Sequence, residues 1–488
     1  MDRKPAGRSF SGSALLMMGG TALAQAIPLL VAPILTRIYG PEQFGALATF
    51  IGLVTVLSVV ATLRLEPAIV LPQDDDDAAR IVAAALAATL LVVVLLFAGS
   101  LLGQAWIAGR WPTIAAGGWL PLVAPTVLCM AVAQTAASWA NRQRCYRTIA
   151  SGNVLLQGGA AASSLALGAV GMTHLGLVVG RLGGHFASAA WLLAAVRLEW
   201  RARAPTLSLA AVWTVVARYR QFPQFNLPYS LIGTASREFL LFAFTAFNLP
   251  EHAGFYGLAR SLLYAPVSLL SASLSQVFFK EAAVSLGTPA FEDLARWLVQ
   301  GIVLVFTPGF AMVAVWGPDI FTLAFGAQWR EAGIYATIFS PAAYLFLFSS
   351  WPERLFEVTG RQRLSLTIQV VFDLASVLVI LALLQGGAGP TVALVAYTAI
   401  ACGYHCTYVA TALGIAGFRP ALLKRAATLA VVLAITATVV LLGCRRLGPI
   451  PGLVTAVSLT AAYTLCVLAW MVRRHRALAD GSGQESSA

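Results

Sequence analysis

The chain has 488 residues, of which 59% are hydrophobic and only 11% are charged, with a formal net charge of +12 at pH 7. Soluble globular proteins carry roughly 25% charged residues, so this composition excludes a soluble enzyme and a disordered chain. The apolar runs are continuous rather than alternating with a period of two, which excludes an outer-membrane barrel. The composition therefore predicts an all-α polytopic membrane protein.

Fourteen apolar runs follow one another along the chain. A spanning helix needs about 20 apolar residues, and the runs fall near residues 12–36, 44–71, 80–103, 115–140, 149–170, 175–196, 222–248, 254–279, 293–316, 332–353, 365–385, 391–414, 422–443 and 450–471. The first run continues through Pro28 and Pro33, so we interpret it as a retained span rather than a cleaved signal peptide. Prolines predict broken helices in this span, in span seven at Pro223 and Pro228, and in span eight at Pro266.

Basic residues are distributed unequally between the loops on the two sides of the predicted membrane. With the N-terminus inside, the cytoplasmic segments hold 21 Lys and Arg residues, whereas the other side holds five, namely Arg37, Arg110, Arg330, Arg445 and Arg446. The positive-inside rule therefore predicts that both termini are cytoplasmic. Because loop topology and attraction to anionic lipids account for the excess charge, it does not indicate nucleic-acid binding.

Two clusters of polar side chains resemble metal sites at first sight. The acidic run Asp74–Asp77 follows span two, and we interpret it as a solvated connector, because a divalent cation needs oxygen ligands that converge from elsewhere as well. Cys402, His405 and Cys406 lie within an apolar run, which favours ordinary helix packing over zinc binding. The sequence therefore predicts neither a metal site nor a cofactor.

Two short sequence echoes indicate an internal repeat. The stretch Pro41–Gly45 (PEQFG) recurs as Pro250–Gly254 (PEHAG), and the Arg-Gln-Arg of residues 142–144 recurs at residues 361–363. Both echoes relate a span to the span six places later, which keeps the same orientation in the membrane, as in transporters built from parallel repeats. We therefore expect two pseudo-symmetric six-helix lobes plus two C-terminal helices.

The predicted domain boundaries follow from this repeat. They are an N-lobe at 1–197, a cytoplasmic interlobe linker at 198–221, a C-lobe at 222–415, two further spans in 416–473 and a cytoplasmic tail at 474–488. No segment outside the spans is large enough for an ATPase or a catalytic domain. We therefore expect a protein that is not an enzyme and that draws its energy from an ion gradient or from the gradient of its substrate.

Arginines within or next to the spans are the candidate substrate-binding groups. An Arg at the bilayer centre costs about 2.5 to 3.5 kcal/mol even on a lenient insertion scale, so it should face a partner or a wet cavity. Arg237 lies nearest the centre of its span, whereas Arg64, Arg181 and Arg260 lie at other depths and Arg37 lies at an outer end. Guanidinium groups hold phosphate oxygens bidentately and stay charged, so a cationic cavity for an anionic headgroup is one hypothesis.

Acidic residues near these arginines support a competing interpretation, in which the charges form interhelical ion pairs. Arg237 and Asp373 both fall near mid-span and are one such pair. Glu238 follows Arg237 but points about 100° away on a helix, so the two cannot neutralise each other on one face. Arg64 and Glu66 are two residues apart and would face nearly opposite sides of a helix, so we expect each to need its own partner.

Several stretches of the chain carry a resemblance to a known family. They are Gly20–Pro28, Ile34–Arg37, Pro41–Gly45, Arg64–Pro72, Gly254–Tyr256 and Gln276–Phe279. The sequence resembles the O-antigen and capsule polysaccharide flippases of bacterial surface-polymer assembly, in the superfamily that also contains the lipid II flippase and the MATE multidrug exporters. None of these stretches is a catalytic signature, so the resemblance points to a type of transporter rather than to a particular substrate.

The resemblance implies translocation of an undecaprenyl-diphosphate-linked oligosaccharide across the bacterial inner membrane by alternating access. We hypothesise that Arg64, Arg237 and Arg260 line the cavity and receive the diphosphate, with Arg37 and Arg181 as further candidates. Candidates for H⁺ or Na⁺ coupling, or for balancing the arginines, are Glu66, Glu238 and Asp373. The implied partners are the lipid-linked oligosaccharide, membrane lipids and other polysaccharide-assembly membrane proteins, without nucleic acid.

Two other functions compete with this interpretation. A cation-coupled multidrug exporter of the MATE type should favour acidic over basic residues in its cavity, and the excess of deep arginines argues against it. A polymer ligase or membrane glycosyltransferase would need polar loops that carry catalytic carboxylates or histidines, and the predicted outer loops are too short to supply them.

Overall fold

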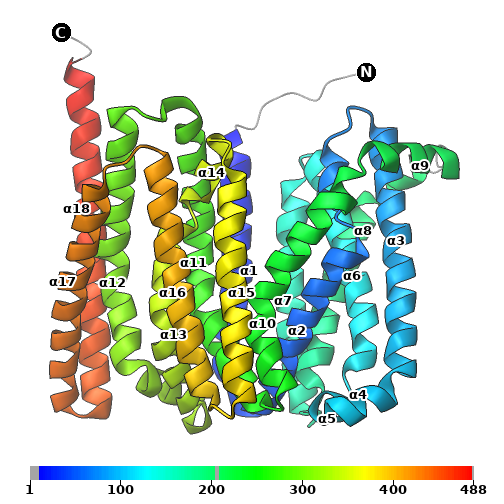
Figure 1. Ribbon diagram of the computed structural model, residues 1–488, viewed down its shortest axis with the longest axis horizontal. Coiled ribbons are helices and arrows are strands. Elements are labelled where there is room, and N and C mark those ends of the chain that lie inside the picture. The colour runs from blue at the N-terminus through cyan, green and yellow to red at the C-terminus, as the bar shows by residue number, and fades with distance from the viewer. Residues whose placement is uncertain (1–9, 204–207, 486–488) are drawn as a thin grey trace. The chain divides into compact units, whose positions relative to one another are not determined.

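Figure 1 shows the computed structural model, which describes residues 10–203 and 208–485. All elements within these ranges are helices. The chain divides into two compact units, Met1–Gly257 and Leu258–Ala488. The N-terminal nine residues and the last three, which belong to the predicted cytoplasmic ends, lie outside the described residues.

The fourteen apolar runs form fourteen long helices in the described part of the chain, each of at least 20 residues. They are α1 (Phe10–Ile38), α2 (Pro41–Ala61), α3 (Asp75–Leu102), α6 (Val123–Arg142), α7 (Tyr146–Ala169), α8 (Gly176–Arg203), α10 (Leu227–Ala246), α11 (Pro250–Ser285), α12 (Pro289–Phe325), α13 (Arg330–Ser349), α15 (Gln362–Gln385), α16 (Pro390–Ile415), α17 (Pro420–Cys444) and α18 (Pro449–Glu485). Eleven are both long and apolar enough to cross a membrane, and the other three, α7, α10 and α11, are less apolar. The protein is a multi-pass membrane protein with the expected helical architecture.

In the first unit, α7 packs between α1 and α8, and α6 contacts α2, α3 and α8. Two aromatic pairs anchor this packing, with the rings of Trp139 and Trp200 at 6.3 Å and those of Phe50 and Trp119 at 5.9 Å, both edge to face. The hydroxyls of Thr49 and Thr245, 2.7 Å apart, join α2 to α10. Since helices in lipid gain little from hydrophobicity alone, close packing and such interhelical hydrogen bonds hold this unit together.

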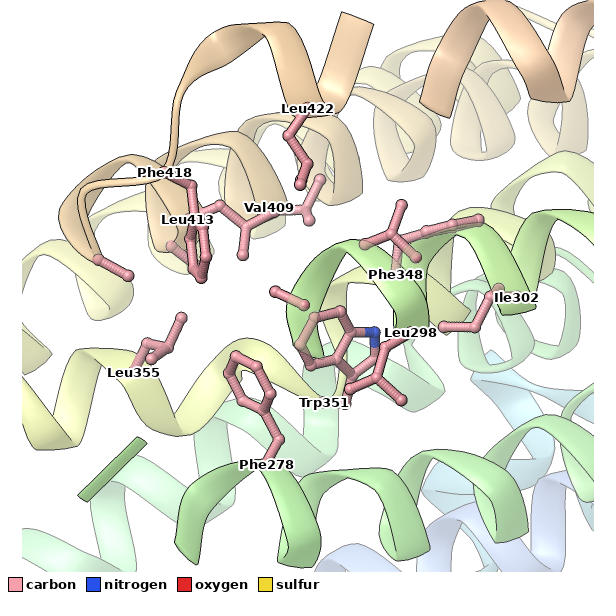
Figure 2. Close-up of a cluster of buried hydrophobic side chains, with 14 of the residues drawn as sticks. Phe278, Leu298, Ile302, Phe348, Trp351, Leu355, Val409, Leu413, Phe418 and Leu422 are labelled. Carbon is pink, nitrogen blue, oxygen red and sulfur yellow. The ribbon is translucent and has the colours of Figure 1, made fainter. Parts of the chain in front are cut away.

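In the second unit, α12 contacts α13, α17 and α18, while α16 packs between α13 and α15. Figure 2 shows the buried cluster at its centre, in which Phe278 of α11 points toward Trp351. Their ring centroids are 4.4 Å apart in an edge-to-face arrangement, and the ring of Phe291 of α12 lies 4.9 Å from that of Phe278. Large rings from three separate segments therefore fix the positions of these helices by dispersion contacts.

Shorter helices occupy the connections. In the first unit these are α4 (Gln104–Arg110) and α5 (Pro112–Ala116) between α3 and α6, and α9 (Leu209–Arg218) before α10. α9 contacts α3 and lies at the opposite end of this unit from α4 and α5 (Figure 1). In the second unit, α14 (Leu355–Val358) separates α13 from α15.

The prolines have a smaller effect on the helices than expected. α1 runs without interruption through Pro28 and Pro33, and α11 runs through Pro266, so the predicted breaks in these two spans are wrong. A proline removes one backbone hydrogen bond, and the remaining turns of a helix this long hold its ends together. In span seven the chain does become irregular, because residues Phe222–Asn226 form a single wide π-helical turn before α10 begins.

The acidic run Asp74–Asp77 forms ion pairs rather than a merely solvated connector. Asp75 lies 2.8 Å from Arg142, while Asp77 lies 2.6 Å from Arg80 and 3.0 Å from Arg218. Arg142 also donates to the carbonyl oxygens of residues 69, 72 and 73. The run therefore ties the end of α6 and the end of α9 to the start of α3, and the sequence missed it because these partners lie far apart in the chain.

The two compact units do not follow the predicted lobe boundaries, since α10 lies with the first unit and packs on α2. Compactness and internal symmetry are different properties, so the boundaries at residues 197, 221 and 415 stay predictions. At the C-terminal end, α18 continues to Glu485 and so includes much of the segment expected to be a tail.

Candidate functional site

Arg64 and Glu66 lie at a break in the backbone rather than on a regular helix. α2 ends at Ala61, and Leu63 and Arg64 then adopt left-handed backbone angles, with φ of 49° and 53°. A short 3₁₀ helix begins at Glu66. This reversal turns the Arg64 side chain back, and its Nη1 donates to Glu66 Oε1 over 2.9 Å. The expectation that the two charges face opposite sides and need separate partners is therefore wrong, because it assumed a continuous helix.

The Arg64–Glu66 pair is an enclosed and electrically neutral unit. The side chain of Glu66 is only 8% exposed and that of Arg64 is 32% exposed. Arg64 Nε and Glu66 Oε2 are both buried without a hydrogen-bond partner in the described part of the chain. The carboxylate thus offsets the charge of Arg64, while each group keeps one open hydrogen-bonding position.

Arg181 is positioned by an unusually close approach of α7 and α8. A Cβ atom on Gly180 would collide with the Ser164 hydroxyl, and one on Gly184 would collide with the carbonyl oxygen of Leu156. Because small residues on α8 face α7, the two backbones come nearly into contact. Arg181, next to Gly180 on the same helix, is thereby brought within reach of α7.

Arg181 has a neutral partner in this position. Its Nη1 donates to Gln157 Oε1 on α7 over 3.1 Å, and its Nε is buried without a hydrogen-bond partner. His185, one turn further along α8, is 5% exposed. Among the residues that the structure describes, no carboxylate lies within ion-pair distance of Arg181. Its positive charge, inside the span Gly176–Arg197, is therefore not compensated.

The other candidates of the first unit are more open. Arg37 is exposed at the end of α1 and donates to the carbonyl oxygen of Pro33 in its own helix. Arg237 is exposed on α10, and its Nη2 lies 3.4 Å from the hydroxyl of Thr234, one turn back. Glu238 is half-buried on the same helix. The contacts of Arg37 and Arg237 lie within single helices, so they leave these two guanidinium groups accessible to a ligand.

In the second unit, Arg260 stands beside a row of stacked aromatic rings. Arg260 is half-buried on α11, and Tyr264 follows one turn later. The ring of Tyr264 stacks on Phe339 of α13 at 5.5 Å, and Phe339 stacks on Tyr397 of α16 at 6.3 Å. Sequence reasoning missed this row, because its members come from three separate helices and no local pattern connects them.

Asp373 is half-buried on α15 in the second unit. Arg237 belongs to the first unit, so an Arg237–Asp373 ion pair stays a prediction. His405 of the Cys-rich stretch is buried, and its Nδ1 lies 2.8 Å from the Ser349 hydroxyl. Within the described residues, no three His, Cys, Asp or Glu side chains are grouped so that they could hold a metal ion.

A family model described as "Polysaccharide biosynthesis protein" matches residues 34–333, which are 300 of the 488 residues. The chain belongs to this family. The chain has no match among the curated proteins. The match covers α2 to α12 and so includes the Arg64–Glu66 pair, Arg181, Arg237 and Arg260.

Two solved structures share the fold of this polysaccharide biosynthesis protein. The lipid II flippase MurJ, in an inward closed conformation, matches with a TM-score of 0.71 at 10% identity over 95% of this chain and 99% of that chain. An inward-facing multidrug resistance MATE family transporter of the MOP superfamily matches with a TM-score of 0.59 at 12% identity, over 84% and 99% of the two chains. At such low identity the likeness establishes the fold, which is the one expected from the sequence.

Proposed function

We propose that this polysaccharide biosynthesis protein translocates an undecaprenyl-diphosphate-linked oligosaccharide from the inner to the outer leaflet of the bacterial inner membrane. It does so by alternating access, with both termini cytoplasmic. The observation that carries the proposal is Arg181, a cation held inside a span by a neutral glutamine. The family and the fold support a transporter that handles a lipid-linked substrate.

The chemistry of the cargo fits this charge. A diphosphate keeps negative charge at any cellular pH, and a guanidinium offers it parallel N–H donors while staying charged itself. An uncompensated Arg in a bilayer costs several kcal/mol unless water or an anion reaches it. Binding of the diphosphate therefore offsets the free-energy cost that the uncompensated arginine imposes on the empty site.

The remaining candidate residues contribute to substrate binding to different extents in this proposal. Arg237, Arg260 and Arg37 add to the attraction for the diphosphate, whereas Arg64 contributes less than the sequence indicates because Glu66 offsets its charge. The aromatic row that begins at Tyr264 offers flat apolar faces on which sugar rings can pack. Glu238 and Asp373 are the candidates for coupling to H⁺ or Na⁺, and no resident cofactor is needed.

Complementation of a flippase-deficient strain tests the proposal, with surface polymer as the measured output and membrane protein levels as the reference. Wild-type protein should restore polymer with at least one defined repeat unit, and Arg181→Ala or Arg237→Ala should reduce it roughly tenfold or more. Arg361→Gln, an exposed change outside the candidate site, is the control and should behave as wild type. Normal polymer with Arg181→Ala and Arg237→Ala at equal protein levels would contradict the assigned roles.

The MATE-like fold makes a cation-coupled drug exporter the alternative. The same strain distinguishes the two functions. Resistance to lipophilic cations without restored polymer, lost when Asp373 or Glu238 is neutralised, would favour the exporter over the flippase.

A further inference from the structure

A groove in the second unit combines charged and apolar walls. It lies between α12 and α17 and is lined by Glu292, Arg296, Val299, Gln300, Arg419, Ala421, Leu422, Arg425, Ala426 and Leu429. We propose that this α12–α17 groove binds an anionic phospholipid of the surrounding membrane, with its phosphate at the arginines and an acyl chain along the apolar wall. The proposal does not depend on the identity of the transported cargo.

Basic side chains outnumber acidic ones in the lining of the groove. Arg296 pairs with Glu292 at 3.3 Å and with Asp293 at 3.2 Å. Arg419 and Arg425 are both exposed, and in the described part of the chain no carboxylate lies within ion-pair distance of either. Two guanidinium groups are therefore available to a phosphate, which is the ligand that such paired donors favour.

The start of α17 adds to this attraction. Arg419 is the N-cap residue, its side chain makes no capping hydrogen bond, and the first turn of the helix contains no acidic residue. The N-terminus of a helix carries partial positive charge, although at α17 Pro420 has no N–H and the N–H of Leu422 donates to the carbonyl oxygen of Arg419. This partial charge lies beside the same groove as the two arginines, so it adds to their attraction for an anion.

The apolar wall distinguishes a lipid from a soluble anion. Leu422, Ala426 and Leu429 continue the groove along α17, and at 1.5 Å per residue the distance from position 419 to 429 is about 15 Å. Beyond the groove, α17 exposes further aliphatic side chains, including Val431, Ile435 and Val439 at 57%, 60% and 63%. The arginines and the aliphatic strip therefore follow one another in the same order as the headgroup and the acyl chain of a phospholipid. Basic recesses between membrane helices recognise anionic headgroups in this manner.

Native mass spectrometry of the full-length protein tests the inference, with phosphatidylglycerol and phosphatidylcholine of the same acyl chains as probes. Wild-type protein should retain phosphatidylglycerol preferentially. Each arginine near a membrane surface contributes a factor of about five to the affinity for anionic lipid, so Arg419→Gln with Arg425→Gln should weaken phosphatidylglycerol binding roughly 25-fold. The charge-preserving pair Arg419→Lys and Arg425→Lys should retain most of the binding.

The matched control is Arg361→Gln with Arg363→Gln, which removes two exposed arginines elsewhere in the same unit. It should bind phosphatidylglycerol within about twofold of wild type. Equal retention of the two lipids by wild type, unchanged binding by the glutamine pair at 419 and 425, or an equal loss in the control would each overturn the proposal. Displacement of phosphatidylglycerol by undecaprenyl diphosphate at equal concentration would overturn it as well, because the groove would then belong to the cargo. Polymer complementation by the same variants measures transport independently of lipid binding. A failure of the lipid-binding proposal can therefore be distinguished from a failure of the proposed function.

Discussion

Gly45 and Gly254 occupy reciprocal positions in one contact. A Cβ atom on Gly45 would collide with the carbonyl oxygen of Pro250, and one on Gly254 would collide with the carbonyl oxygen of Pro41. Pro41 begins α2 and Pro250 begins α11, so the two copies of the sequence echo meet each other at equivalent atoms. Exchange of equivalent contacts is what a two-fold axis produces. This reciprocal contact is what the predicted internal repeat would produce at the first echo.

The reciprocal contact predicts that Gly45→Ala and Gly254→Ala each lower stability by about 1 to 3 kcal/mol, since a backbone carbonyl cannot rotate away as a side chain does. Thermal unfolding of the purified protein in detergent measures the effect. Gly99→Ala, at an exposed position of α3 with open space around its Cβ, is the control and should leave the unfolding temperature unchanged or slightly raised. Equal unfolding temperatures for all three variants would refute the contact.

The Arg64–Glu66 pair predicts a strong coupling between the two residues. Glu66→Ala should destabilise the protein by about 1 to 3 kcal/mol, because it leaves a partly buried guanidinium without its carboxylate. Arg64→Ala with Glu66→Ala should cost less than the sum of the two single changes. A double-mutant cycle of unfolding free energies measures this coupling, and strictly additive values would show that the pair is not formed.

The pairing of Asp77 with Arg218 predicts that this carboxylate holds α9 in place. Asp77→Asn should increase hydrogen exchange in residues 208–220, while overall stability falls by no more than about 1 kcal/mol, since Arg218 is 60% exposed. Asp74→Asn is the matched control. It removes the same charge from the same run, and asparagine preserves the cap that Asp74 provides to the backbone N–H of Asp76. Exchange in α9 that responds equally to both changes would contradict the assignment.

Because the partner of Arg181 is neutral, we predict that a carboxylate in its place affects stability and transport in opposite directions. Gln157→Glu supplies a carboxylate of nearly the same shape, so the protein should be at least as stable as wild type, while affinity for an anionic cargo falls roughly tenfold. Unfolding temperature and surface polymer in the complemented strain are the two measurements. Gln362→Glu, an exposed change of the same type on α15, should alter neither. Unimpaired transport with Gln157→Glu would remove Arg181 from the binding role.

The positions of the helices could be predicted from the sequence, whereas several local contacts could not. Each apolar run became a helix, because a segment in lipid must satisfy its backbone hydrogen bonds internally, and eleven of these helices are long and apolar enough to cross a membrane. The Arg64–Glu66 pair could not be predicted, because nothing in the local sequence indicates that Leu63 and Arg64, which are not glycines, adopt left-handed backbone angles. The pairing of Arg181 with Gln157 depends on how closely two helices approach, which only the packed structure determines.

The uncompensated charge of Arg181 has an electrical consequence for a transport cycle. An anionic cargo reduces the net charge of the loaded site, while the empty site stays positive, so the two half-cycles move different charges through the membrane field. One elementary charge that crosses the whole field gains about 2.3 kcal/mol per 100 mV. In the proposed transport cycle, an inside-negative membrane potential therefore acts on the return step and drives the empty site back toward the cytoplasm.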